Sequence, residues 1–149
     1  MKYYFPSPIG IICLKGDGKS ITSLELNVQC TFSDSWEVFR IAEKQLLEYF
    51  AGIRTEFDIP VKLHGTEFQL SVWEQIKNIP YGQVITYGDI AKAIGNPKAC
   101  RAVGNAVGAN PLPIIIPCHR VVAANGIGGF SCGLDIKLKL MKIEQSSLV

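Results

Sequence analysis

The sequence predicts an α+β protein, with a small antiparallel β-sheet and one helix followed by a mostly helical second half. Three short apolar runs separated by Pro- and Gly-containing turns lie in the first part of the chain. From Thr66 onward, apolar residues recur at helical spacing between capping and breaking residues. The 149 residues, 48% of them hydrophobic, suffice for two small domains, which we expect at residues 1–65 and 66–149.

The sheet is predicted from runs that are rich in Ile, Leu and Tyr. The segment Gly16-Asp17-Gly18, which precedes the last of these runs, is typical of a hairpin. Nothing in this half looks catalytic, so we interpret it as a scaffold. The three runs are residues 2–5, 9–14 and 21–26.

Two further elements are predicted in the first half. A helix is expected to start at a cap within residues 33–35 and to run to about Phe50, because Phe39, Ala42 and Leu46 recur at helical spacing. Residues 57–61 are predicted to form another short strand, broken by Pro60.

Three helices are predicted between Thr66 and the end of the small-residue segment 98–107. Thr66 is expected to cap the first, which ends before residue 80. Thr86 is a good N-cap for the second, with Asp89 three residues later as a weak capping box. Pro97 suits the first turn of the third helix.

The second and third of these helices match the helix-turn-helix pattern, whose second helix lies in a DNA groove. For helix pairs in general, an ordinary αα-hairpin is the commoner explanation. Here the second helix has small side chains and one long cation, Arg101, so its backbone could approach a groove closely. Small residues would equally allow close packing against another helix, and both alternatives stay open.

The chemistry is expected in residues 114–122, with the sequence IIIPCHRVV. Pro117 predicts a sharp turn there, with Cys118, His119 and Arg120 between two buried extended runs. A thiolate is a good nucleophile, and a neighbouring imidazole can take the thiol proton. The alternative is a buried, inert cysteine beside a surface histidine. Adjacent strand residues point to opposite faces, so Cys118 and His119 can interact only if the turn bends or a water bridges them.

The residues after this stretch form a Gly-rich loop and a last helix. The loop, residues 125–133, lacks the lysine that a phosphate-binding loop requires, so nucleotide binding is not expected. The helix is predicted over residues 135–144.

Composition narrows the class of protein. The formal net charge of +2 permits nucleic-acid binding without indicating it. No run approaches the roughly 18 apolar residues of a membrane helix and no signal peptide is evident, so we expect no membrane contact and a cytoplasmic location. The five cysteines form no C-x-x-C pair and are expected to be free, with no metal or cofactor. They are Cys13, Cys30, Cys100, Cys118 and Cys132.

Four segments of the second half resemble a known family. The run from Pro117 to Val122, PCHRVV, is similar to the signature of the O6-alkylguanine-DNA alkyltransferases, also called methylated-DNA–protein-cysteine methyltransferases. Residues 81–87, 95–104 and 110–114 match in register. The resemblance covers about residues 68–144, whereas residues 1–65 match only loosely.

The resemblance implies a ribonuclease H-like first domain and a winged-helix-like helix-turn-helix domain that together repair DNA by direct reversal. The alkyl group of O6-alkylguanine, with O4-alkylthymine as a further candidate, would move irreversibly to Cys118 after base flipping. The protein would therefore be a single-turnover, suicide transferase. The expected partner is double-stranded DNA, bound in the minor groove with little sequence preference, and the expected state is a monomer.

The resemblance also implies roles for individual residues. Cys118 takes the place of the acceptor, His119 would act as its base through a water, and Glu144 would orient that histidine. Tyr87 would donate its hydroxyl to the guanine as the base leaves, and Asn110 would hold the active-site turn. The residues expected to contact DNA or substrate are Arg101, which would enter the stack at the flipped nucleotide, Tyr87, Ser131, Pro113 and Lys137.

Three positions depart from the family pattern. Cys132 stands where a glycine is common, which adds bulk and a second thiol at the expected pocket edge. Gly108 replaces an arginine of some relatives, so phosphate contacts are expected to be fewer, and Cys100 puts a thiol on the groove-facing helix. Some relatives bind zinc in the first domain, with a ligand set that Cys13, Cys30 and His64 do not reproduce.

Two other functions stay open on the residues alone. A cysteine hydrolase using Cys118 and His119 would need turnover and an oxyanion hole, and its histidine is usually distant in sequence. A helix-turn-helix regulator that senses alkylation or oxidation would bind a specific DNA sequence, whereas a repair protein should not.

Overall fold

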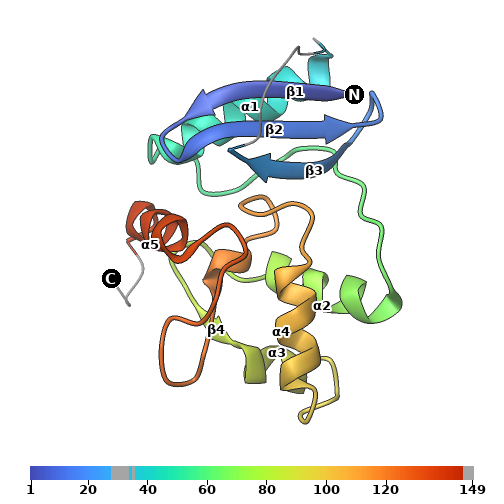
Figure 1. Cartoon of the computed structure of the whole chain (residues 1–149), viewed down its shortest axis with the longest axis vertical. Coiled ribbons are helices and arrows are strands. Elements are labelled where there is room, and N and C mark those ends of the chain that lie inside the picture. Colours follow the sequence, from blue (N-terminus) through green and yellow to red (C-terminus); the bar gives the residue numbers. More distant parts are fainter. Residues whose placement is uncertain (28–33, 35, 146–149) are drawn as a thin grey trace. The chain divides into compact units, whose positions relative to one another are not determined.

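The structure, a computed structural model, describes residues 1–27, 34 and 36–145. The chain divides into two compact units, Met1–Leu63 and His64–Val149, shown in Figure 1. The mixed α+β class predicted from the sequence is confirmed. Among the described residues, no helix is both long and apolar enough to span a bilayer.

The first unit is built on a three-stranded antiparallel sheet (Figure 1). Its strands are β1 (Lys2–Ser7), β2 (Gly10–Gly16) and β3 (Ile21–Leu26), which pair in chain order and confirm the three expected runs. Leu14 lies opposite Leu24, and both are buried. Because side chains alternate between the faces of a strand, this register gathers the apolar residues on one face.

Helix α1 (Glu37–Phe50) packs against the sheet through its aromatic side chains. The rings of Tyr3 and Phe39 stack with centroids 5.5 Å apart. The expected serine cap was wrong, because the N-cap residue is Trp36, which makes no side-chain capping bond. The Trp36 ring instead stacks on Phe39 at 5.7 Å, so aromatic packing fixes the first turn. Ser33 and Ser35 lie outside the described residues.

The predicted strand at residues 57–61 was wrong. Within the described part of the chain, this segment makes a single isolated bridge, between Val61 and Ile21. Ile21 N donates to Pro60 O over 2.8 Å, and Lys62 N donates to Ile21 O over 3.0 Å. Because Pro60 has no N–H, the ladder cannot extend through it.

The second unit contains the predicted helices with their caps. Helices α2 (Glu67–Lys77) and α3 (Tyr87–Ala93) each begin with a complete capping box, Thr66 with Gln69 and Thr86 with Asp89. Helix α4 (Cys100–Gly108) packs against both. The two helices expected to form the helix-turn-helix are α3 and α4, which pack against each other.

The start of α4 differs from the prediction. The N-cap residue is Ala99, and Pro97 lies in a turn two residues earlier, so the expected start at Pro97 was wrong. Pro97 fixes the turn that separates the two helices and does not begin the second.

The reactive stretch is a compact turn. Residues 118–120 form a 3₁₀ turn, η1 (Cys118–Arg120), followed by β5 (Val121–Val122), which pairs in parallel with β4 (Ile85–Thr86). The extended run predicted before the turn was wrong, because Ile114 has a φ of 75° within a turn of its own. A left-handed conformation is rare for a β-branched residue and costs on the order of 1–2 kcal/mol. Helix α5 (Leu134–Ile143) packs on η1.

Candidate active site

Cys118 lies at a cavity of about 170 Å³ inside the second unit. The residue is 2% exposed and is one of those that line the cavity. One wall is the backbone of α4, and the other is the Gly-rich loop. The lining residues are Tyr87, Gly104, Val107, Gly108, Cys118, Gly129, Phe130 and Ser131.

Asn110 holds the turn that carries the thiol. Its side-chain Nδ2 donates to Ile116 O over 2.8 Å, and its Oδ1 accepts from Leu112 N over 3.0 Å. Ile116 N in turn donates to Leu112 O over 2.8 Å. One buried amide therefore spans both sides of the turn that contains Ile114.

The Cys118 thiol is protonated at neutral pH. Burial raises its pKa to about 11, against smaller opposing effects of a hydrogen bond from Asn110 and of the Lys137 charge. The neighbouring Cys132 acts in the same direction as burial. A nucleophile in this state needs a base at the moment of reaction.

The histidine beside the thiol is completely buried and faces a carboxylate. His119 Nε2–H donates to Glu144 Oε2 over 2.5 Å, which fixes the ring and leaves Nδ1 as the atom to take a thiol proton. Burial lowers the pKa of His119, while the bond to Glu144 opposes that shift. A neutral imidazole is the form that can accept a proton. The structure thus brings His119 and Glu144 together, with His119 directly after Cys118 in η1.

Arg120 completes this network, and the sequence interpretation gave it no role. Its Nε and Nη2 donate to the two oxygens of Glu144 over 2.9 and 3.0 Å. Gly82 N also donates to Glu144 Oε1, over 3.1 Å. The only sequence signal was its position next to His119, because its partner lies 24 residues away on a different element.

Lys137 is fully buried under the Gly-rich loop. Its Nζ donates to the carbonyls of Val121, Ile127 and Gly129 over 2.7, 2.6 and 2.9 Å. Burial lowers the pKa of Lys137 to about 8, yet three carbonyl acceptors use all three N–H groups of an ammonium. The charged form therefore fits the geometry, and the side chain pins the loop from inside. Its expected contact with substrate stays a prediction.

Tyr87 joins the loop to the start of α3. Its hydroxyl accepts from Gly129 N over 3.3 Å. Gly128 has a φ of 74°, and a Cβ there would lie 3.0 Å from the Tyr87 hydroxyl. Glycine is therefore required at this point for both the backbone conformation and the close approach of the phenol.

The remaining predicted residues occupy different surroundings. Ser131 lines the cavity and is exposed, whereas Cys132 is half-buried and is not among the lining residues. Arg101 is exposed on α4, on the face that also carries Gly104. Pro113 is buried in the turn before Cys118 and does not line the cavity, so its contact with substrate stays a prediction.

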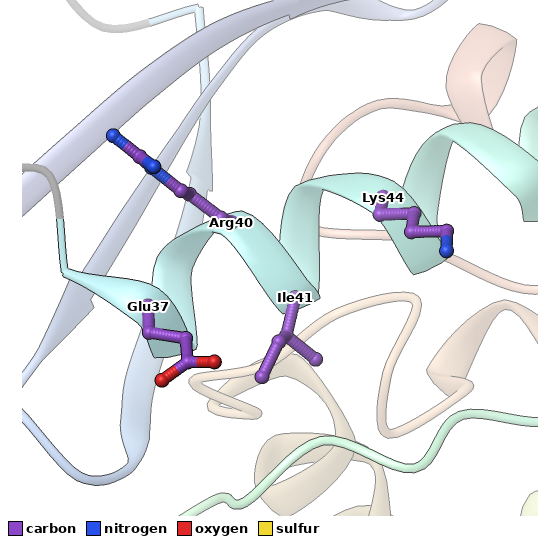
Figure 2. A pocket seen from close by; sticks show the side chains of 4 residues that line it. All are labelled: Glu37, Arg40, Ile41 and Lys44. Carbon is purple, nitrogen blue, oxygen red and sulfur yellow. The ribbon is translucent and has the colours of Figure 1, made fainter.

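A second hollow lies in the first unit, along α1 (Figure 2). Figure 2 shows Glu37 and Ile41 pointing to one side of the helix and Arg40 to the other. Among the residues that the structure describes, its lining combines one acid, two bases and an aliphatic side chain, with no thiol or hydroxyl nucleophile. The residues are Glu37, Arg40, Ile41 and Lys44.

Each of the two units matches a domain of the same protein family. Residues 1–63 match the ribonuclease-like domain of 6-O-methylguanine DNA methyltransferase, and residues 67–146 match the DNA binding domain of 6-O-methylguanine DNA methyltransferase. A methylated-DNA–protein-cysteine methyltransferase of Methanosarcina acetivorans is 51% identical over 154 residues, covering 97% of this chain and 99% of its own.

Solved structures of Mycobacterium tuberculosis proteins are similar over the whole chain. The OGT of that organism, crystallised in complex with DNA, is 42% identical with a TM-score of 0.90, over 97% of this chain and 92% of its own. The O6-methylguanine methyltransferase of the same organism has a TM-score of 0.88 at 42% identity, over 100% of this chain and 95% of its own.

Proposed function

Because the chain belongs to the 6-O-methylguanine DNA methyltransferase family, we propose that it repairs DNA by moving an alkyl group from the O6 atom of guanine to Cys118. The observation that carries the proposal is the buried Cys118, which lines a cavity and is followed directly in η1 by His119, the residue hydrogen-bonded to Glu144. The substrate is alkylated double-stranded DNA, and each molecule reacts once.

The reaction balances without any cofactor. The Cys118 S–H proton passes to His119, and the sulfur forms a bond to the alkyl carbon as the carbon–O6 bond breaks. The electron pair of that bond stays on the guanine, and the Tyr87 hydroxyl donates a hydrogen bond that stabilises the leaving base. The proton released by the thiol ends on the guanine ring. The products are an unmodified guanine and an S-alkylcysteine, a thioether that water does not readily cleave, so there is no turnover.

The DNA must present its base outside the helix, because a duplex hides the O6 atom. Helix α4 has the surface for this step, since Arg101, Gly104 and Gly108 share one face and only Arg101 has a long side chain. A bare helix face suits the minor groove, and Arg101 would fill the gap left by the flipped nucleotide. Because small side chains offer few groups to the edges of the bases, binding is proposed to be nearly independent of sequence, by a monomer.

A cytoplasmic location is part of the same proposal. It is supported by the unpaired state of the described cysteines Cys13, Cys100, Cys118 and Cys132, which suits a reducing compartment.

The test is the intact mass of the full chain after incubation with duplex DNA that contains O6-methylguanine. We expect the gain of a single methyl group, located on Cys118 by peptide mapping. Cys118→Ser should gain none and still bind DNA, whereas Cys132→Ser, which removes the neighbouring thiol, should react. Methyl groups on another cysteine, or repeated turnover with an unmodified protein, would contradict the proposal.

A further inference from the structure

The Glu144 carboxylate has its acceptor positions filled by four donors. Oε1 accepts from Arg120 Nε and Gly82 N, and Oε2 accepts from Arg120 Nη2 and His119 Nε2. A carboxylate offers about four lone-pair sites, so a proton on either oxygen would displace one of these donors. The geometry therefore requires the ionised form of Glu144, although its side chain is only 1% exposed.

We propose that Arg120 is a positioning residue for the transfer, which holds Glu144 as an anion aimed at His119 and offsets its charge so that the imidazole rests neutral. Arg120 does not touch the cavity and acts through Glu144 and His119. This role rests on the proposed alkyl transfer, because a resting imidazolium could not accept the Cys118 proton.

Two further contacts hold the guanidinium in place while its fork meets Glu144. Arg120 Nη1 donates to Ile79 O over 2.7 Å, and its guanidinium lies 5.7 Å from the centre of the Tyr81 ring. Both partners come from the segment after α2, whereas Glu144 caps the end of α5. Arg120 thus ties α5 to that segment, and a lysine could supply its charge but not its planar fork.

The charges around His119 explain why the guanidinium is needed. Arg120 acts on it from η1, Lys137 acts on it from α5, and Glu144 bonds it from the C-cap of α5. Cys118 precedes it in η1, and Tyr81 lies beside the Arg120 and Glu144 pair. The Glu144 anion raises the pKa of His119, and Arg120 and Lys137 lower it. Without Arg120 the buried anion would be balanced most simply by a proton on the imidazole.

The test reads the histidine directly. The chain has two histidines, so NMR titration of the unalkylated protein can follow the imidazole signals of His119, which a His64→Gln variant identifies. In wild type, His119 is expected to stay neutral down to a pH below the ordinary histidine pKa. In Arg120→Met the titration midpoint of His119 should rise by about one pH unit or more. The pH below which the reaction with free O6-benzylguanine slows should rise equally, so at a fixed acid pH the rate should fall roughly tenfold per unit.

Two further variants separate charge from geometry. Arg120→Lys should keep the His119 midpoint near wild type, because the charge remains, but should slow transfer because the fork is lost. Arg54→Met, which removes an arginine paired with Glu48 in the first unit, should change neither quantity.

The role of Arg120 would be overturned if the titration midpoint of His119 were the same in folded Arg120→Met as in wild type. If Arg120→Met does not fold, Arg120→Lys decides, and an unchanged transfer rate in that variant removes the positioning role. The titration needs no substrate, so a wild type that fails to alkylate Cys118 would refute the proposed function while the electrostatic part of the inference is still measured.

Discussion

Trp73 of α2 donates its indole N–H to the backbone carbonyl of Ala106 in α4, over 2.8 Å. Both residues are buried, with Trp73 2% exposed and Ala106 3% exposed. The bond ties α2 to the helix that we propose to contact DNA, so α4 is held from behind while its Arg101 face is open to solvent.

Trp73→Phe tests this tie by removing the N–H and keeping most of the ring system. We expect the free energy of unfolding to fall by about 1–2 kcal/mol, since a net hydrogen bond and part of an indole are lost. Ala106 O also accepts from Ala109 N over 3.2 Å, so the carbonyl keeps a donor and a larger loss is not expected. Urea denaturation measures the change. Trp36→Phe, the same change in the first unit, is the matched control. A Trp73→Phe protein as stable as wild type would show that the bond to Ala106 does not stabilise the fold.

The sequence predicted the features of this site that are local in the chain. The capping residues Thr66 and Thr86 mark helix starts because a hydroxyl bonds the backbone three residues away. The Pro117 turn and the thiol–imidazole pair were evident from consecutive residues. Each of these signals depends on neighbours within a few positions, which is the range that a single sequence conveys.

Features that depend on distant partners were not predictable in the same way. Arg120 meets Glu144 across 24 positions, and Trp73 meets Ala106 across 33. Lys137 would ordinarily be assigned to a solvent-exposed helix face, because lysine is seldom fully buried. Its three carbonyl partners exist only once the Gly-rich loop has folded over it.

Lys137→Met is expected to loosen that loop. Three carbonyls lose their donor, and we expect a loss of about 2–4 kcal/mol in unfolding free energy, with part of the cost relieved where Gly129 reaches water. Transfer should also slow, because the loop carries Ser131 at the cavity. Lys139→Met, an exposed position on the same helix, should be nearly neutral by thermal and urea unfolding. Equal effects of the two changes would show that the buried contacts contribute little.

His119 makes stability depend on pH in a defined direction. Burial holds the folded-state pKa of His119 below its ordinary value near 6.5, so below that pH the unfolded chain binds a proton that the folded chain excludes. Stability from this source is therefore present above about pH 6.5 and is lost as the pH falls toward the folded pKa. Urea titrations across this range should show the loss, and His119→Gln should reduce it. His64→Gln is the control, and an identical pH profile for His119→Gln and wild type would contradict the assignment.

Arg101→Ala should separate the flipping of the nucleotide out of the duplex from the alkyl transfer to Cys118. A flipped nucleotide leaves a gap in the duplex that Arg101 is proposed to fill, whereas a free base needs no flipping. We expect transfer from O6-methylguanine in duplex DNA to slow by roughly tenfold to a hundredfold, with little change for free O6-benzylguanine. Lys92→Ala, which removes an exposed cation from the last turn of α3, controls for general loss of charge. If both substrates slow equally, Arg101 has no part in flipping.

Gly104 gives a test in which stability and reactivity should move in opposite directions. It lies within α4, lines the cavity, and a Cβ built there meets no heavy atom within 4 Å. Gly104→Leu should therefore raise the free energy of unfolding by about 0.5–1 kcal/mol, because glycine is a poor helix former. The same side chain would occupy part of a cavity of about 170 Å³, so transfer from O6-benzylguanine should slow by roughly tenfold or more while methyl transfer slows less.

Two comparisons decide which wall of the cavity limits the size of the alkyl group. Asn105→Leu adds the same side chain at an exposed α4 position that does not line the cavity, and it should leave both rates near wild type. Cys132→Gly tests the opposite side, where the sequence suggested crowding. Cys132 has no left-handed φ and does not line the cavity, so its removal should change the benzyl rate less than Gly104→Leu does. A large gain for benzyl transfer in Cys132→Gly, with no loss in Gly104→Leu, would move the size limit from α4 to the Gly-rich loop.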